Sequence, residues 1–449
     1  MRRFAPPLLW LALFSCALGA FAAPAPASST PDLRRAAEGV CDRPAVACSV
    51  IAFTRRPLGS GIAEYSIRLR VGPGAHDEIG LHRVVREQSP FHPAPTQRAV
   101  LLAHGDAWGF DSAFLASVTS PAAPDERALP IFLARRGIDV WGIDFRWTLL
   151  PQDTADLSFL ASWGIRTDAR DLGIALVFAR GVRLATGQGA ARIHLLGWSR
   201  GGQTALVYLN GESQLPPPLR QARGLIAVDT LLKSDDAEIR QAACTRLGDT
   251  QALLAAGQTA ATSGQLFVSL GSLAEFAPAA ASPIVPGVTN LDAARLAGSA
   301  TYVFLGPGRS FVPFYHFLGG TFDAAGNPTG FSFTDQAYWF DFLQGASPLE
   351  PNRLLADGDE AICDQTDVPF DDHLGDIRVP ALYLGAGGGI GDFGAYTMSL
   401  LGSPDVTLHV VALGPPDARP TEIGHVDIFT ATNAPALFWQ PLLDWIRAH

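Results

Sequence analysis

Short, uninterrupted runs of apolar residues recur in two parts of the chain and mark its strands. Runs of this length without alternation are typical of strands that are covered on both faces. Helical patterns fill several of the intervals, notably residues 128–136 and the long amphipathic stretch 167–184. Strands that alternate with helices predict the α/β class, with a mostly parallel central sheet and helices on both faces. The six runs are residues 99–103, 138–143, 193–196, 225–228, 381–384 and 406–411.

A different pattern precedes the first of these runs. Residues 65–71 alternate strictly between polar and apolar side chains, as a half-buried antiparallel strand does. Another strand-like run begins at Cys48, and the glycines around Ser60 predict a hairpin between the two. The sheet is therefore expected to begin with antiparallel strands.

The alternation of strands and helices stops between residues 230 and 375. It resumes just before the apolar run at 381, which predicts a core in two parts, 41–229 and 376–449, with a cap domain at 230–375 inserted between them. Residues 302–342 within the insertion are unusually rich in aromatic side chains. Any single ring is more easily explained by ordinary packing, but together they favour the roof of an apolar pocket.

The first 22 residues have the pattern of an export signal. Arg2 and Arg3 precede an apolar stretch, and Ala20-Phe21-Ala22 provides a cleavage site of small residues. The apolar stretch is shorter than the roughly 20 residues that a membrane span needs. We therefore expect a secreted or periplasmic protein without a stable membrane span, in which residues 23–40 form a linker.

Four cysteines follow the predicted signal. An even number of cysteines in an exported chain suggests two disulfides. The expected pairs are Cys41–Cys48 and Cys244–Cys363, where the second pair would join the two ends of the insertion; four reduced, buried thiols are the alternative. No cysteine pair has two-residue spacing and no HExxH motif occurs, so neither a metal site nor a cofactor is expected.

Composition narrows the choice of partner. Hydrophobic residues make up 48% of the 449 residues, which is ample for a buried core. The net charge is −10 and no basic patch stands out, so nucleic acid is not an expected partner.

The motif Gly197-Trp198-Ser199-Arg200-Gly201-Gly202 follows directly on the run 193–196 and precedes an apolar helical segment. A serine between a buried strand and a helix, in the pattern G-x-S-x-G, is the arrangement called the nucleophile elbow. The tight turn exposes the hydroxyl at the end of the sheet, and the glycines permit close approach of the backbone. Ser199 is therefore the candidate nucleophile, and Trp198 is expected to pack.

The order of the motifs along the sequence indicates which residues are the expected base and the expected oxyanion hole. In this arrangement the serine comes first, then the acid, then the histidine. His425 lies after the last strand run and is the expected base. His104-Gly105 ends the run 99–103, and that corner is expected to donate a backbone N–H to a developing oxyanion, with Asp106 and Arg200 as the two donors.

The acid has two candidates. Asp392 is the first carboxylate after the run 381–384 and is the expected partner of His425, although a glycine-rich loop separates it from that run. Asp229, at the end of the run 225–228, is the rival. Asp427 is expected to cap a helix instead.

Together these motifs resemble the α/β-hydrolase superfamily, in particular serine esterases and lipases that carry a large inserted cap. The resemblance implies a Ser–His–Asp triad, an acyl-enzyme and no cofactor. It suggests hydrolysis of small-molecule or lipid-like esters with apolar acyl or aromatic groups. Hydrolysis of amides or carbon–carbon bonds, or non-catalytic binding of an apolar ligand, are the alternatives. The segments that carry the resemblance are Leu102-Ala103-His104-Gly105, the elbow, Val379-Pro380-Ala381 and Gly424-His425.

Overall fold

The computed structural model describes residues 32–41 and 48–449. The predicted export signal and the first part of the predicted linker lie outside the described residues. Within the described ranges, none of the helices combines the length and the apolar character that crossing a membrane requires.

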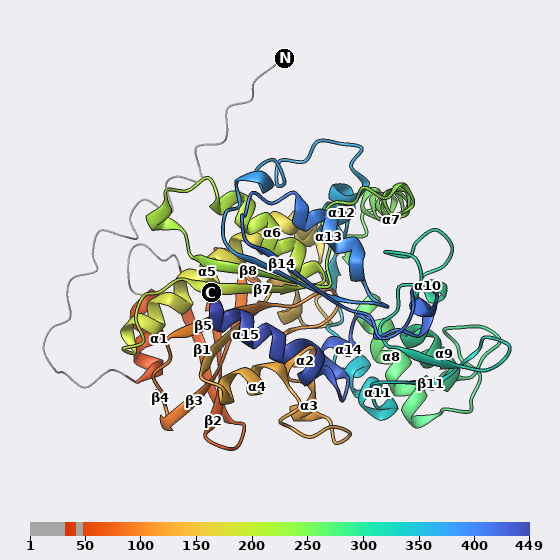
Figure 1. The fold of residues 1–449 in the computed structure, drawn as a ribbon, viewed down its shortest axis with the longest axis horizontal. Coiled ribbons are helices and arrows are strands. Elements are labelled where there is room, and N and C mark those ends of the chain that lie inside the picture. Colours follow the sequence, from red (N-terminus) through yellow and green to blue (C-terminus); the bar gives the residue numbers. More distant parts are fainter. Residues whose placement is uncertain (1–31, 42–47) are drawn as a thin grey trace, which may run out of the picture.

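A ten-stranded sheet forms the centre of the molecule (Figure 1). From β6 to β14 neighbouring strands run parallel, whereas the first three strands are antiparallel. All six apolar runs are strands of this sheet, so the predicted mostly parallel sheet is confirmed. The order is β1 (Ser49–Pro57), β2 (Ile62–Arg70), β3 (Glu78–Ser89), β6 (Ile138–Asp144), β5 (Arg98–Ala103), β7 (Ile193–Trp198), β8 (Ala222–Val228), β13 (Ala381–Ala386) and β14 (Val406–Val411), with β4 (His92–Pro93) paired to β3.

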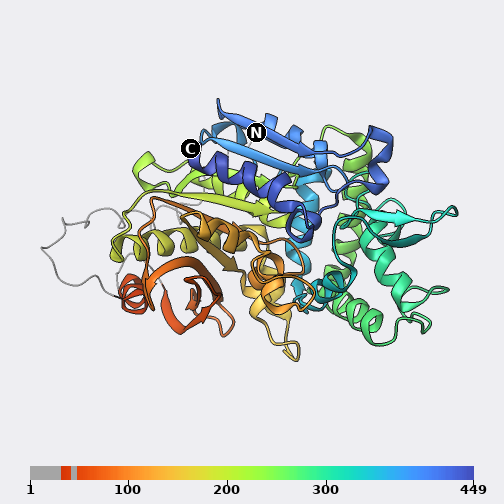
Figure 2. The same ribbon diagram turned by 60° about the horizontal axis from the view of Figure 1, so that its bottom comes forward.

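Helices cover both faces of the sheet, and successive residues of a strand belong to different cores. In β5, Val100 and Leu102 join the core beneath one pair of helices, while Leu101 joins the core beneath the other. This is the expected consequence of the two-residue period of a strand. Figures 1 and 2 show the helices on the two sides. One face carries α4 (Leu129–Arg135) and α15 (Gln440–Ala448), and the other carries α5 (Ile165–Ala185) and α6 (Arg200–Glu212).

Two elements differ from those that the sequence predicts. The end of the predicted linker forms helix α1 (Leu33–Cys41), which buries one apolar face against α5. Strand β3 was not predicted, because charged side chains interrupt its apolar pattern. Arg83 in that strand is fully buried and forms two hydrogen bonds of 2.8 and 2.7 Å with Asp139 of β6. A buried ion pair therefore takes the place of an apolar contact there.

The segment between β8 and β13 is mainly helical and lies beyond the ends of the parallel strands (Figure 2). We refer to residues 230–375 as the inserted segment. Two short strand pairs accompany its helices: β9 (Ala260–Ala261) with β12 (Glu350–Pro351), and β10 (Gly320–Phe322) with β11 (Pro328–Phe331). The helices are α7 (Ala237–Ala255), α8 (Ser263–Phe276), α9 (Asn290–Ser299), α10 (Thr301–Phe304), α11 (Gln336–Gln344) and α12 (Asn352–Cys363).

Both predicted disulfides are present. Cys244 in α7 is bonded to Cys363 at the end of α12, which joins the first and last helices of the inserted segment. Cys41 at the end of α1 is bonded to Cys48.

The inserted segment contacts helix α6 through Arg200. This buried side chain donates from Nε to Asp106 at 2.9 Å and from Nη1 to Gln203 at 2.6 Å. Helix α12 passes so close that a Cβ atom at Gly358 would overlap Nη1 of Arg200. Glycine is therefore required at this position, because a side chain would have to displace a guanidinium that is already held by two partners.

Removal of the long-range disulfide is expected to destabilise the protein more than removal of the short one. The Cys244–Cys363 bond closes a loop of 119 residues, and the Cys41–Cys48 bond closes one of 7. On the loop-entropy argument, the first contributes about 4–5 kcal/mol and the second about 2 kcal/mol. Thermal melting of the two double Cys→Ala variants should show the larger fall in Tm for the first pair. Equal losses would contradict the argument from loop length.

Gly358→Ala is expected to destabilise the protein by about 1–3 kcal/mol, because the added methyl group overpacks the contact with Arg200. Gly248 in α7 provides a matched control, since it is exposed in a helix and a Cβ atom added there would meet no other atom within 4 Å. Gly248→Ala should leave stability unchanged or raise it by up to about 1 kcal/mol. Denaturant unfolding compares the two, and the same small effect from both would refute a special contact at Gly358.

Candidate active site

Ser199 lies in a tight turn between β7 and α6. Its backbone has φ 55° and ψ −124°, a strained conformation for a residue with a side chain. The turn is stabilised from the next strand, since Ser199 N–H donates to the carbonyl of Val228 at 3.0 Å and Thr230 Oγ1 donates to the carbonyl of Ser199 at 2.7 Å. A Cβ atom at Gly201 would overlap the carbonyl of Ala103. The segment therefore has the strand–turn–helix geometry that the G-x-S-x-G pattern predicted.

His425 is buried and is paired with Asp229. Its Nδ1 atom lies 2.6 Å from Oδ2 of Asp229. Asp229 is the first residue after β8 and is itself fully buried, with a positive φ of 44°. A carboxylate in this position accepts a hydrogen bond from Nδ1–H and leaves Nε2 of the imidazole as the acceptor.

The glycine-rich loop after β13 surrounds the carboxylate of Asp229. Oδ1 of Asp229 accepts hydrogen bonds from the N–H groups of Ala386 and Gly391, at 2.9 and 3.0 Å, and Oδ2 accepts one from Ile390 at 2.9 Å. A Cβ atom at Gly389 would overlap Oδ2 of Asp229. The glycines thus allow the loop to wrap closely around this carboxylate.

The expected pairing of His425 with Asp392 is not found. Asp392 is exposed in a short 3-10 helix, Gly391–Gly394, and forms no hydrogen bond or ion pair with His425. The loop turns back over Asp229 after β13 and therefore carries Asp392 past the imidazole. The signal for Asp229 was its position directly after a buried strand run, which made it the second candidate in the sequence.

The loop after β5 lies against the nucleophile turn. A Cβ atom at Gly105 would lie 2.8 Å from Cβ of Ser199, so the backbone of this loop closely approaches the serine. His104 fixes the loop from behind: Nδ1 lies 2.9 Å from the carbonyl of Gly105, and Phe145 N–H donates to Nε2 at 3.4 Å. Because a carbonyl can only accept and an N–H can only donate, the geometry requires a neutral ring with the proton on Nδ1. Burial also lowers the pKa of His104.

The side chains of Asp106 and Arg200 form an ion pair, with Nε of Arg200 2.9 Å from Oδ1 of Asp106. Both residues line the same pocket as Ser199. Glu350 of β12 lies behind this pair, where burial and the negative charge of Asp106 raise the pKa of its carboxyl group well above the usual range. The direction is that expected of a buried carboxyl group next to another carboxylate, because both influences disfavour its charged form.

The pocket beside Ser199 has a small cavity volume, about 30 Å³, and both parts of the core and the inserted segment contribute to its walls. Of the aromatic stretch 302–342, Phe311 and Tyr315 line the pocket, whereas Trp339 and Phe342 are fully buried in the core. The walls are formed by Asp106, Ser199, Arg200, Gln203, Asp229, Thr230, Leu231, Phe311, Tyr315, Ile362 and Ile390.

The side chains of Ser199 and His425 form no hydrogen bond with each other, and they are linked through Trp198 and Asp229. The indole of Trp198 stacks on the imidazole with ring centroids 4.9 Å apart, and Asp229, which binds the imidazole, lines the pocket with Ser199. Hydrogen bonds of catalytic groups are often long without a ligand and tighten when a substrate binds.

A second cluster contains the residue types of a metal site. Ligand atoms of Glu64, His82 and Asp111 lie within 4.8 Å of one another. However, both ring nitrogens of His82 already bind carboxylates, Glu64 at 2.7 Å and Asp144 at 2.9 Å. Burial disfavours the charged ring, but these carboxylates outweigh it and raise the pKa of His82 well above its ordinary value. The cluster is therefore a set of ion pairs, with a protonated histidine in the place of a cation.

Comparison with known proteins gives matches in structure only. No family model matches the chain, and no curated protein matches it in sequence. A Sulfolobus solfataricus protein assigned as a lipase matches with a TM-score of 0.59 and 19% identity, over 89% of this chain and 99% of that one.

Two further structures match with lower scores. A monoglyceride lipase from Saccharomyces cerevisiae has a TM-score of 0.41 at 13% identity, over 95% and 99% of the two chains. An esterase from Thermogutta terrifontis has a TM-score of 0.40 at 13% identity, over 85% and 98%. The conclusion rests on the first match together with the strand order and the helices on both faces: the chain has the α/β-hydrolase fold.

Proposed function

We propose that the protein is a serine hydrolase of carboxylic esters, with Ser199 as nucleophile, His425 as general base and Asp229 as the acid. The observation that carries this proposal is the buried hydrogen bond between His425 and Asp229 beside a strained serine turn. Asp229 holds the imidazole in the tautomer that has a free Nε2 and stabilises the imidazolium that forms when the serine loses its proton.

The reaction follows from these positions. Ser199 attacks the ester carbonyl while His425 takes the hydroxyl proton, and His425 then gives this proton to the leaving alcohol. Water then attacks the acyl-enzyme. His425 takes a proton from this water and returns it to the oxygen of Ser199 as the acyl bond breaks. The backbone N–H groups of Asp106 and Arg200 are the proposed donors to the oxyanion. Two observations support this proposal: Gly105, next to Asp106, closely approaches Ser199, and Arg200 is the first residue of α6.

The pocket favours a substrate with a modest apolar group. Its apolar walls come from Leu231, Phe311, Tyr315, Ile362 and Ile390, and its cavity volume of about 30 Å³ is far below that of a pocket that encloses a large ligand. We therefore expect short acyl chains or a single aromatic ring to fit better than long fatty acyl chains.

The inserted segment is proposed to act as the cap of this site, since Phe311, Tyr315 and Ile362 close the pocket opposite the sheet. We also propose that the protein is exported, because two disulfides stabilise it and oxidising compartments are where disulfides persist.

The nucleophile is tested with p-nitrophenyl esters of increasing chain length. The wild-type protein should hydrolyse acetate to hexanoate esters faster than palmitate, and Ser199→Ala should abolish turnover without a change in Tm. A fluorophosphonate should label Ser199 in the wild-type protein only. Absence of both turnover and labelling would favour a protein that binds an apolar ligand without catalysis.

The acid is tested with a pair of isosteric substitutions. Asp229→Asn should lower kcat by about 10⁴-fold, because an amide no longer fixes the tautomer or stabilises the imidazolium. Asp392→Asn, the matched control on the adjacent loop, should leave kcat within about twofold, since Asp392 is exposed and does not contact His425. A large loss from Asp392→Asn with little effect of Asp229→Asn would overturn the assignment.

A further inference from the structure

The residue before the nucleophile presents an aromatic face to the proposed base. The rings of Trp198 and His425 are stacked, with centroids 4.9 Å apart and planes inclined by 28°. Trp198 is 1% exposed and His425 is 2% exposed, so water has little access to either ring. Two other aromatic rings lie near the imidazole but at less parallel or more distant positions: Tyr315 at 5.3 Å and 53°, and Phe317 at 6.3 Å and 35°.

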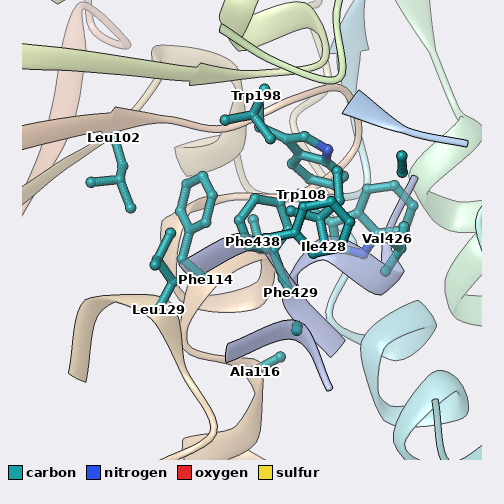
Figure 3. Close-up of a cluster of buried hydrophobic side chains, with 14 of the residues drawn as sticks. Leu102, Trp108, Phe114, Ala116, Leu129, Trp198, Val426, Ile428, Phe429 and Phe438 are labelled. Atoms are coloured by element: carbon teal, nitrogen blue, oxygen red, sulfur yellow. The ribbon is translucent and has the colours of Figure 1, made fainter. Parts of the chain in front are cut away.

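The indole is held in this position by its own neighbours. Phe429 and Phe114 contact it in edge-on geometry at 5.1 and 6.4 Å, and Trp108 lies 6.5 Å away (Figure 3). This cluster surrounds Trp198 in the buried core, so the ring has little freedom to move away from the imidazole. The stacking is therefore a fixed feature of the site.

The stacked indole stabilises the protonated form of His425 more than the neutral form. A tryptophan face is negative and attracts a cation within about 6 Å of its centroid, most strongly where water is excluded. Neutral imidazole gains little from this field, whereas imidazolium gains more. Because the proposed mechanism forms imidazolium in the transition state, the interaction is stronger there than in the ground state, which is the condition for catalysis.

Other charged and titratable groups surround the base on the packed elements. Asp229 is the anion at Nδ1. Asp427 accepts the N–H of Gly424 at 2.8 Å on the loop of the base itself, and burial raises its pKa to about 6. The remaining groups are Tyr315 and His316 in the inserted segment, Arg419 and Glu422 in the loop before the base, and Asp106 and Arg200 on the side of the nucleophile.

We propose that Trp198 is a positioning residue that stabilises the imidazolium form of His425 through a cation–π contact, on the face of the ring, while Asp229 stabilises it at Nδ1. This inference rests on the proposed function. It assigns the residue before the nucleophile a part in the proton transfer in addition to its packing.

The test is a graded series, Trp198→Phe and Trp198→Leu. Phenylalanine keeps a weaker aromatic face and leucine keeps none, so kcat on a p-nitrophenyl ester should fall in the order Trp, Phe, Leu, by about 10- to 30-fold in total. The sign of the pH effect follows as well. Loss of the aromatic face destabilises the protonated base, so the midpoint of the acidic limb of kcat/KM should move to lower pH, by up to about one unit.

If Trp198 had only a packing role, its substitution would lower activity but would not move the pH midpoint of kcat/KM in the order Trp, Phe, Leu. Phe114→Leu is the matched control, because it removes the more distant edge-on neighbour of Trp198, at 6.4 Å, while Phe429 at 5.1 Å still holds the indole against His425. It should lower Tm and leave the pH midpoint unchanged. Asp427→Asn is measured alongside to separate the titration of that carboxyl group from that of the base.

Protonation is also followed without turnover, through the ring signal of His425 in histidine-labelled protein, identified by its loss in His425→Gln. This measurement distinguishes failure of the inference from failure of the proposed hydrolase, since it requires no ester cleavage. The same signal midpoint in wild type, Trp198→Phe and Trp198→Leu would overturn the role of Trp198. A midpoint that falls in that order would support it even if no tested ester is cleaved.

Discussion

The carboxylate of Asp229 is the interaction on which the arrangement of the site depends. Four groups converge on its two oxygens: the imidazole of His425 and the N–H groups of Ala386, Ile390 and Gly391. These groups and the carboxylate come from three segments that are far apart in the chain. A buried carboxylate without such partners would be strongly disfavoured, so its desolvation requires all of them to be in place. The same contacts that stabilise the charge therefore also align the loops around the proposed base.

A second pairing links the opposite side of the site to the inserted segment. Arg200 binds Asp106, whose backbone belongs to the loop beside Ser199, and fits against Gly358 in α12. The guanidinium is buried, and burial and the charge of Asp106 raise the pKa of Glu350, which lies beside the pair. Arg200 therefore has two structural roles. Its backbone begins α6, and its side chain forms the contact between the core and the inserted segment.

The sequence predicted those features that depend on local patterns. Buried parallel strands appear as continuous apolar runs, and the nucleophile turn requires glycines at set positions, so both could be recognised. Strand β3 could not, because Arg83 is neutralised by Asp139, a partner 56 residues away. The sequence also could not decide whether Asp229 or Asp392 pairs with His425, because the answer depends on contacts between distant segments. Both follow strand runs, and only the path of the glycine loop decides which carboxylate meets His425.

The attachment of the inserted segment to the core limits how the walls of the pocket can change during evolution. Its first and last helices, α7 and α12, are bonded covalently through Cys244 and Cys363, and α12 rests on the guanidinium beside the nucleophile. The portion between these helices is attached at a second place, because His425 N–H donates to the carbonyl of His316 at 3.0 Å and Val426 N–H donates to the carbonyl of Phe317 at 2.8 Å. The walls contributed by Phe311 and Tyr315 lie between these two attachments. Divergence that changes those walls therefore has to preserve both the anchored helix pair and the backbone contact with the loop of His425.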